Sequence, residues 1–203
     1  MQKILEKKER SLGVKLSIKG DRCGSPKCAL IRKPYRPGQH GKSHRRKVSE
    51  FGKQLQEKQK VRFTYGLSEK QLGKVFSEAE RKAEVTSQGV IEILESRLDN
   101  VIFRLGFVSS RSAARQLVGH GHFSVHGRKV TIPSRRMKIG DKVSIRPESK
   151  NAAVFQDLKD KLKNYEVPTW LSFDKEKLEG EIVAKPHDVI APFDINAVVD
   201  YYS

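Results

Sequence analysis

The segment from residue 94 to residue 146 constrains the fold of this chain more tightly than any other part. Its first half spaces apolar residues as one face of a helix does: Leu94, Leu98, Val101, Ile102 and Leu105. Such a stripe must be covered by other apolar side chains, so it predicts a helix packed on a core, ended by Gly106. Ser110 can cap a second helix. The inward face of that helix would carry Ala114, Leu117 and Val118, and Gly119 and Gly121 would stop it.

The second half of the segment has the signals of antiparallel strands. A His-Gly pair at 126–127 interrupts the apolar positions of residues 123–132, which favours a tight hairpin. A Gly-Asp turn at 140–141 then leads into a further alternating run, at Val143 and Ile145. The segment therefore predicts two helices packed on a short antiparallel sheet.

This helix-pair-and-hairpin segment resembles the S-four-type RNA-binding domain. In that family the second helix and the loop after it present basic and polar side chains to structured RNA, and the matching positions are Arg111, Arg115, Gln116, His120 and Arg128. The alternative is that the arginines only form a solvated helix face. If Arg111 and Arg115 serve RNA alone, reversing both to Glu is expected to abolish binding and to leave thermal stability nearly intact.

Four further segments extend the resemblance to nearly the whole chain, which is similar to the small-subunit ribosomal protein four family. They are YRPGQHG (35–41), EKQKVRFTYGLSEKQL (57–72), RLDNVIFRLGF (97–107) and PTWLSFD (168–174). The resemblance implies a structural constituent of the small ribosomal subunit, a primary rRNA-binding protein that nucleates assembly at a multi-helix junction in the 5′ region. It also implies contact with small-subunit ribosomal protein five and a contribution to translational accuracy near the mRNA entry channel. The alternative is a translational repressor that binds mRNA with the same surface.

The charge of the chain independently calls for an anionic partner, since its formal net charge is +17. Residues 1–50 hold 15 Lys and Arg against 4 acidic residues, whereas residues 151–203 hold 6 against 10. This asymmetry favours one RNA-facing side. No apolar run approaches the roughly 20 residues that span a bilayer, and no secretory signal is evident. We expect no membrane partner, and a cytoplasmic place on the ribosome or the equivalent compartment of an organelle.

Together these features predict an α+β protein in three parts. Residues 1–48 are expected to be a basic, extended N-terminal RNA-binding arm, because they lack periodicity and contain three prolines. Residues 49–89 would form a helical domain, which the family resemblance completes with residues 188–203. Residues 90–187 would form an inserted α+β domain, a helix pair on an antiparallel sheet, with the RNA-binding module at 94–150.

Finer patterns predict elements within these parts. Ser68 and Gln71 fit a capping box, and residues 82–89 lack an apolar repeat, which indicates a link. Phe155, Leu158, Leu162 and Tyr165 are spaced for an amphipathic helix. Two strands, at 170–173 and 181–184, would extend the central sheet. The last residues, 194–202, fit a short helix or an extended tail.

Two groups of candidate RNA contacts lie outside the module. The first is in the motif at 35–41: Arg36, Gly38, Gln39, His40 and Gly41, where glycines permit close backbone approach and the polar side chains can bond phosphate or sugar. The second is on the helix before residue 66: Lys58, Lys60 and Arg62. The alternatives are an ordinary Gly/Pro turn and a solvated helix with snorkelling lysines.

We expect no metal, cofactor or catalytic site. Cys23 and Cys28 alone cannot close a four-ligand zinc site, and the second cysteine pair that some family members carry near the N-terminus is missing. His40 and His44 could complete such a site only by removing His40 from the RNA-contacting motif. RNA-modifying enzymes and tyrosyl-tRNA synthetases can share the module, but residues 151–203 are too few for a catalytic domain, and no catalytic motif is present.

Overall fold

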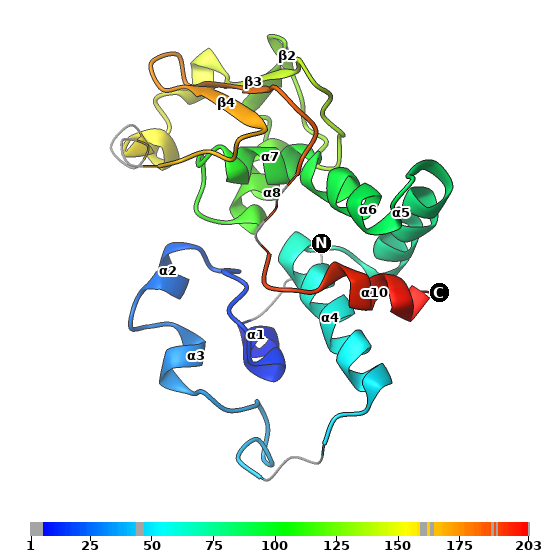
Figure 1. Cartoon of the computed structure of the whole chain (residues 1–203). Helices are drawn as coiled ribbons and strands as arrows, with labels where there is room; N and C mark the ends of the chain where they lie inside the picture. The colour runs from blue at the N-terminus through cyan, green and yellow to red at the C-terminus, as the bar shows by residue number, and fades with distance from the viewer. Residues whose placement is uncertain are drawn as a thin grey trace. The chain divides into compact units, whose positions relative to one another are not determined.

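Helices make up the first part of the chain, and a five-stranded antiparallel sheet forms in the second (Figure 1). The computed structural model describes residues 6–43, 47–158, 162, 165–187, 189 and 191–202. The chain divides into two units, Met1–Val90 with Val189–Ser203, and Ile91–Asp188. None of the helices that the structure describes is long and apolar enough to cross a membrane. The α+β class predicted from the sequence is confirmed.

The first unit begins with three short helices, α1 (Lys7–Leu12), α2 (Asp21–Gly24) and α3 (Ala29–Arg32). The side chain of Glu9 is buried and accepts hydrogen bonds from the amides of Leu16 (2.8 Å) and Ile18 (3.3 Å), so the chain folds back on α1. The segment is thus more folded than the extended arm expected from its composition. The prolines act as expected, since α2 and α3 end shortly before Pro26 and Pro34.

Two longer helices and the end of the chain complete this unit. They are α4 (Glu50–Tyr65), α5 (Glu69–Lys82) and α10 (Ile195–Tyr202). The predicted capping box of Ser68 and Gln71 is present at the start of α5. α10 packs on α4 and α5 through ring contacts: Phe51 lies 5.5 Å from Tyr201, and Phe76 stacks at 4.5 Å on Tyr202. The final residues therefore form a helix with a buried face.

The next helices differ from the sequence pattern. α6 (Thr86–Glu95) includes residues 86–89, where a link was expected, and α7 (Leu98–Arg104) begins only after a break. The break arises because Arg97 is extended and pairs with Arg136 in an isolated β-bridge, while the amide of Met137 donates to the carbonyl of Ser96 at 2.8 Å. A distant segment therefore competes for backbone groups that would otherwise continue the helix.

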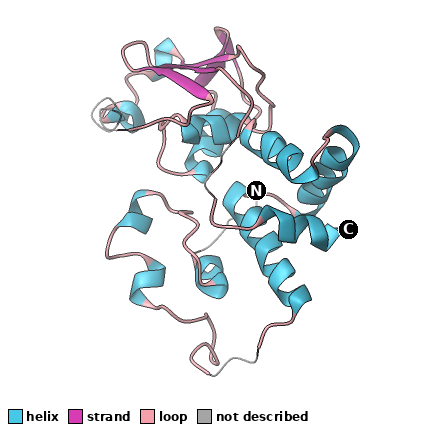
Figure 2. Ribbon diagram, in the orientation of Figure 1, coloured by secondary structure: helices cyan, strands magenta, loops and turns pink. Residues whose placement is uncertain are grey.

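The predicted sheet is confirmed and has the strand order β2-β1-β3-β5-β4. The strands are β1 (Phe123–Val125), β2 (Arg128–Lys129), β3 (Lys142–Ile145), β4 (Leu171–Asp174) and β5 (Glu179–Ile182). His126 and Gly127 both have positive φ, as a tight hairpin turn requires. Figure 2 shows the strands together on one side of the helices of this unit. The predicted extension by two later strands is correct, with β5 beginning two residues earlier than expected.

The core of the second unit lies between this sheet, α7 and α8 (Arg111–Gly119). Trp170 and Phe107 are its largest fully buried side chains, and the rings of Phe107 and Phe123 meet edge to face at 5.6 Å. After β3 come two short 3₁₀ helices, Pro147–Ser149 and Ala153–Phe155. Of the amphipathic helix predicted around residues 155–165, the apolar positions 155, 158 and 162 are buried, and residues 159–161 and 163–164 lie outside the described residues.

Candidate RNA interface

The second helix of the module holds its arginines against acidic side chains. On α8, Arg115 donates through Nε (2.9 Å) and Nη2 (2.6 Å) to Oδ2 of Asp99. Arg97 approaches the same carboxylate, with Nε 3.1 Å from Oδ1 and Nη2 3.0 Å from Oδ2. Asp99 comes from the first turn of α7, and its side chain is only 3% exposed. It therefore lies between two guanidinium groups.

A second acidic side chain, fully buried, organises the other arginines. Glu95, the last residue of α6, accepts two hydrogen bonds of 2.9 Å from Arg104 and one of 2.6 Å from Nδ2 of Asn100. Arg111 donates through Nε to Oδ1 of Asn100 at 2.7 Å, and its Nη2 lies 3.8 Å from Glu95. The Arg111 guanidinium also lies 4.4 Å from the centre of the Phe103 ring. These contacts fix the direction of each guanidinium group.

These contacts define an arginine network of four arginines and two carboxylates: Arg97, Arg104, Arg111, Arg115, Glu95 and Asp99. Its net charge is positive, and the Arg111 and Arg115 side chains are 15% and 17% exposed. The sequence placed these two arginines away from the core, either on RNA or on a solvated face. It missed the two acids, Glu95 and Asp99, although they stand four residues apart in the sequence beside the apolar stripe. Arg111 and Arg115 are thus held in place by acidic side chains and have a structural role. The expectation that reversing both to Glu leaves thermal stability nearly intact does not take this role into account.

The remaining candidates of the module lie on α8 (Gln116), at its C-terminal end (His120) and on β2 (Arg128). Gln116, His120 and Arg128 are all exposed. Within the part of the chain that the structure describes, Arg128 forms no ion pair, so its charge is available to a phosphate. Nearby, Nδ1 of His122 lies 3.0 Å from the hydroxyl of Ser149, which holds the start of β1 to the segment after β3.

The glycine motif of the first unit forms a tight turn. Gly38 has φ +101°, and a Cβ on Gly41 would lie 1.9 Å from the carbonyl oxygen of Arg36, so both glycines are required. Arg10 fastens this turn to α1 by donating to the carbonyls of residues 33, 35 and 36 at 3.0, 3.1 and 3.4 Å. Gln39 and His40 are exposed at its tip. The motif therefore presents its polar side chains from a braced backbone.

The three candidate cations of α4 all have partners within the chain. Lys58 is 5% exposed, with Nζ 2.6 Å from Glu69 and 4.0 Å from the centre of the Tyr201 ring. Lys60 pairs with Glu57, and Arg62 donates to the carbonyl of Leu67 and lies 3.5 Å from Glu69. The contact proposed between Lys58 and RNA is not retained, because its ammonium group holds α4 to α5 and α10.

The contact of Lys58 with Glu69 and α10 predicts that the packing of α10 is lost at alkaline pH. Burial alone would lower the pKa of Lys58, but the Glu69 carboxylate raises it above its ordinary value, and burial together with Glu69 raises the pKa of Tyr202 to about 12. A pKa raised by folding contributes stability that is complete below the unfolded value and is lost as the pH rises through the folded one. We expect α10 to loosen between the ordinary tyrosine pKa of 10.0 and about 12. Proteolysis of the C-terminal segment across this range is the measurement, and a pattern independent of pH would contradict the assignment.

The two cysteines are free and buried, and burial raises the pKa of the Cys23 thiol. No group of three or more His, Cys, Asp and Glu side chains in the described ranges is arranged to hold a metal ion. His44, considered as a ligand beside His40, lies outside the described residues. The cysteine pair thus has the surroundings of packed core residues.

Comparisons with known proteins cover most of the chain. The model of the family described as "Ribosomal protein S4/S9 N-terminal domain" matches residues 4–95, and that of the "S4 domain" matches residues 96–143. The chain is 48% identical over 196 residues to small ribosomal subunit protein uS4A of Alkaliphilus metalliredigens and 45% identical over 196 residues to uS4 of Thermus thermophilus. Each of these alignments covers 96% of this chain and 94% of the relative. uS4 of Syntrophomonas wolfei is 48% identical over 177 residues, which are 87% of this chain and 85% of the relative.

Proposed function

Because the chain belongs to the small ribosomal subunit protein uS4 family, we propose that it binds the small-subunit rRNA at a multi-helix junction in the 5′ region and nucleates assembly there. Members of this family are structural constituents of the small subunit and not enzymes. The observation that carries the proposal is the arginine network. Four guanidinium groups are fixed by two buried carboxylates before any RNA binds, so little side-chain entropy is lost on binding.

Shape selectivity follows from such fixed positions. The grooves of an A-form helix are poorly read by side chains, so proteins recognise folded RNA mainly through its backbone geometry. Cations held in fixed positions match one arrangement of phosphates better than others. We propose Arg111, Arg115, Gln116, His120 and Arg128 as the contact surface of the module, with Glu95 and Asp99 holding the two guanidinium groups of α8 in place.

The glycine motif supplies the second contact in this proposal. Its tip residues, Gln39 and His40, project from a turn that Arg10 fastens, and Arg36, Gly38 and Gly41 shape the backbone. We keep residues 1–48 as the arm, 49–89 with 188–203 as the helical domain and 90–187 as the inserted domain. Contact with small-subunit ribosomal protein five, the effect on decoding accuracy near the mRNA entry channel and residence in the cytoplasm or an organelle rest on the family resemblance alone.

A binding titration tests the proposal. The full-length protein is titrated against the 5′ domain of small-subunit rRNA and against an unrelated structured RNA of equal length, across a series of salt concentrations. We expect a preference for the rRNA of roughly 10³ or more that persists at higher salt, because only the nonspecific part falls steeply. Equal binding that disappears with salt would reject selective rRNA recognition. A stronger preference for an mRNA leader would favour the translational repressor.

Arg128→Glu is expected to weaken binding to the rRNA without changing stability. Arg128 is exposed on β2 and has no ion-pair partner among the described residues, so its loss removes about one phosphate contact. The slope of log affinity against log salt should then fall by about 1. Lys177→Glu is the matched control, since Lys177 is 78% exposed and pairs with Asp174 in the turn between β4 and β5. Equal effects of the two variants would mean that net charge alone determines binding.

A further inference from the structure

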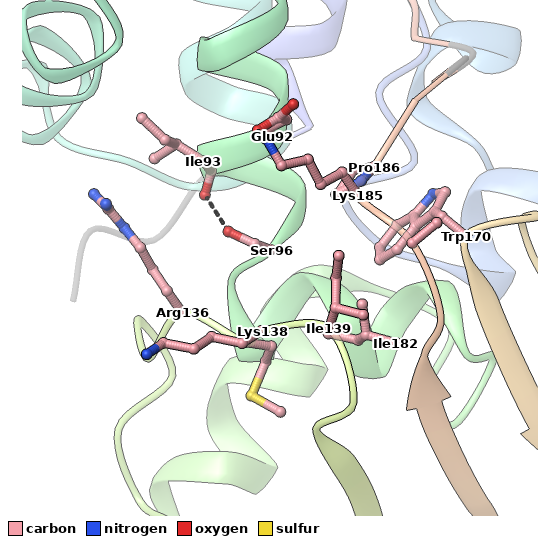
Figure 3. Close-up of a pocket in the computed structure, with 12 residues that line it drawn as sticks. Glu92, Ile93, Ser96, Arg136, Lys138, Ile139, Trp170, Ile182, Lys185 and Pro186 are labelled. Atoms are coloured by element: carbon pink, nitrogen blue, oxygen red, sulfur yellow. Dashed lines mark hydrogen bonds and ion pairs between the residues drawn. The ribbon is translucent and has the colours of Figure 1, made fainter. Parts of the chain in front are cut away.

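An apolar groove of about 510 Å³ lies within the second unit, and none of the residues proposed above to contact RNA lines it (Figure 3). The end of α6, the segment at 136–139, the residue before β4 and the end of β5 with the residues after it form its walls. Its floor consists of Met137, Trp170 and Ile182, each no more than 5% exposed. At its edge Ile139 is 59% exposed, which is unusual for so large an aliphatic side chain.

The rim of the groove is basic. Arg136, Lys138 and Lys185 are exposed. Arg136 and Lys138 lie on one side of the groove and Lys185 on the other (Figure 3). The single acid of the lining, Glu92, lies 3.3 Å from Lys185, so these two charges offset each other and the net positive charge of the lining comes from Arg136 and Lys138. A partner that fills the groove thus meets an apolar floor between positive charges.

The polar groups of the groove are already used inside the protein. The hydroxyl of Ser96 donates to the carbonyl of Ile93 at 3.2 Å, which is the dashed line in Figure 3. The carbonyl of Ile182 accepts from the amide of Gly140 at 2.8 Å, and its amide donates to Asp141. A nucleobase needs a stacking platform and free groups that read its edge. The aliphatic floor offers neither, because Trp170 is only 1% exposed.

We propose that this groove docks a segment of a neighbouring protein that carries an aliphatic anchor flanked by Asp or Glu. Apolar pockets ringed by charge are typical of the centre of a protein interface, where one buried anchor supplies most of the affinity. Acidic residues beside the anchor would be opposite in sign to the net positive charge of the rim, where Arg136, Lys138 and Lys185 outnumber Glu92. The groove would then give the protein a docking site for a second protein that is separate from its RNA-binding surface.

The test uses the full-length protein with methyl-labelled isoleucines and a short synthetic peptide of leucines flanked by glutamates. We expect the peptide to shift the methyl signals of Ile139 and Ile182, and Ile139→Asp to weaken its binding by about tenfold or more. The control variant is Ile132→Asp, because Ile132 is equally exposed, at 61%, and does not line the groove. A second peptide keeps the glutamates and replaces the leucines with serine, so it tests charge alone.

Three results would overturn the proposal. The first is equal binding of the serine and leucine peptides, which would mean that the apolar floor is unused. The second is that both methyl signals stay unchanged when the leucine peptide is at saturation. The third is that a single-stranded RNA oligonucleotide displaces the peptide and shifts the same signals, which would make the groove an RNA site. Binding of Ile139→Asp to the 5′ domain of rRNA is measured in parallel and is expected to be unchanged, which separates this proposal from the proposed function.

Discussion

Reversing both Arg111 and Arg115 to Glu is expected to unfold the second unit or to bring it close to unfolding. The two guanidinium groups lie against Glu95 and Asp99, whose side chains are 0% and 3% exposed. The variant would place four carboxylates beside the two remaining arginines, Arg97 and Arg104, where the native chain has two carboxylates and four arginines. Removing one partner of a buried ion pair costs about 3–5 kcal/mol, and a whole domain is stable by only about 5–15 kcal/mol.

The intrinsic fluorescence of Trp170 measures this effect selectively, because it is the single tryptophan of the chain and is buried in the core of the second unit. We expect thermal unfolding of this core at a much lower temperature in the variant. The control is Arg128→Glu with Lys129→Glu, which changes net charge by the same amount on the exposed strand β2. If the double arginine variant melts with the native protein, the expectation drawn from the sequence was right and the network adds no stability.

Lys58→Glu is expected to release α10 from α4. The new carboxylate would face Glu69 in a site where Lys58 is 5% exposed, and it would lie over the electron-rich face of Tyr201 instead of a cation. The Glu69 side chain is 47% exposed, so water screens part of the repulsion and we expect a loss of about 2–3 kcal/mol. Hydrogen exchange of the α10 amides is the direct measurement.

Two further variants sharpen this second experiment. Lys53→Glu is the matched control, because Lys53 lies on the same helix, is 61% exposed and pairs with the exposed Glu50. Lys58→Met keeps the hydrocarbon part of the side chain and removes the charge, so it should protect α10 better than Lys58→Glu. Rapid exchange in the Lys53 variant as well would show that α10 responds to net charge and not to this contact.

The elements that the sequence predicted correctly are those whose signals are local. Ser68 and Gln71 bond the ends of their own helix, Ser110 caps α8 through the amide of Ala113, and His126 with Gly127 forms the hairpin turn. Each of these devices acts over a few residues, so the sequence pattern contains it. Apolar residues recur at every second position in the strands and about every 3.6 positions in the helices. This spacing likewise identified most of the core of the second unit.

The errors arose where distant segments meet. The helical spacing of apolar residues continues from Leu94 to Leu98, but the helix is interrupted between them. The backbone of residues 135–137 forms hydrogen bonds with Ser96 and Leu98 instead. The link that the sequence predicts at 82–89 is present only at 83–85, between α5 and α6. Gly89 instead lets α6 lie against the end of α5, where a Cβ would come within 2.4 Å of Ala83.

The sequence by itself determined the α+β class, the module of two helices on a hairpin and the basic character of the chain, and it supplied the candidates for RNA contact. Only the tertiary structure decided which of those residues point outward and which are already paired. Arg115 and Lys58 look alike in a sequence, as cations on helices, but one is held by Asp99 and the other is buried beneath α10. Helix and turn signals act between neighbours in sequence, whereas an ion pair or a groove needs side chains that folding brings together, and the pattern along the chain does not contain that proximity.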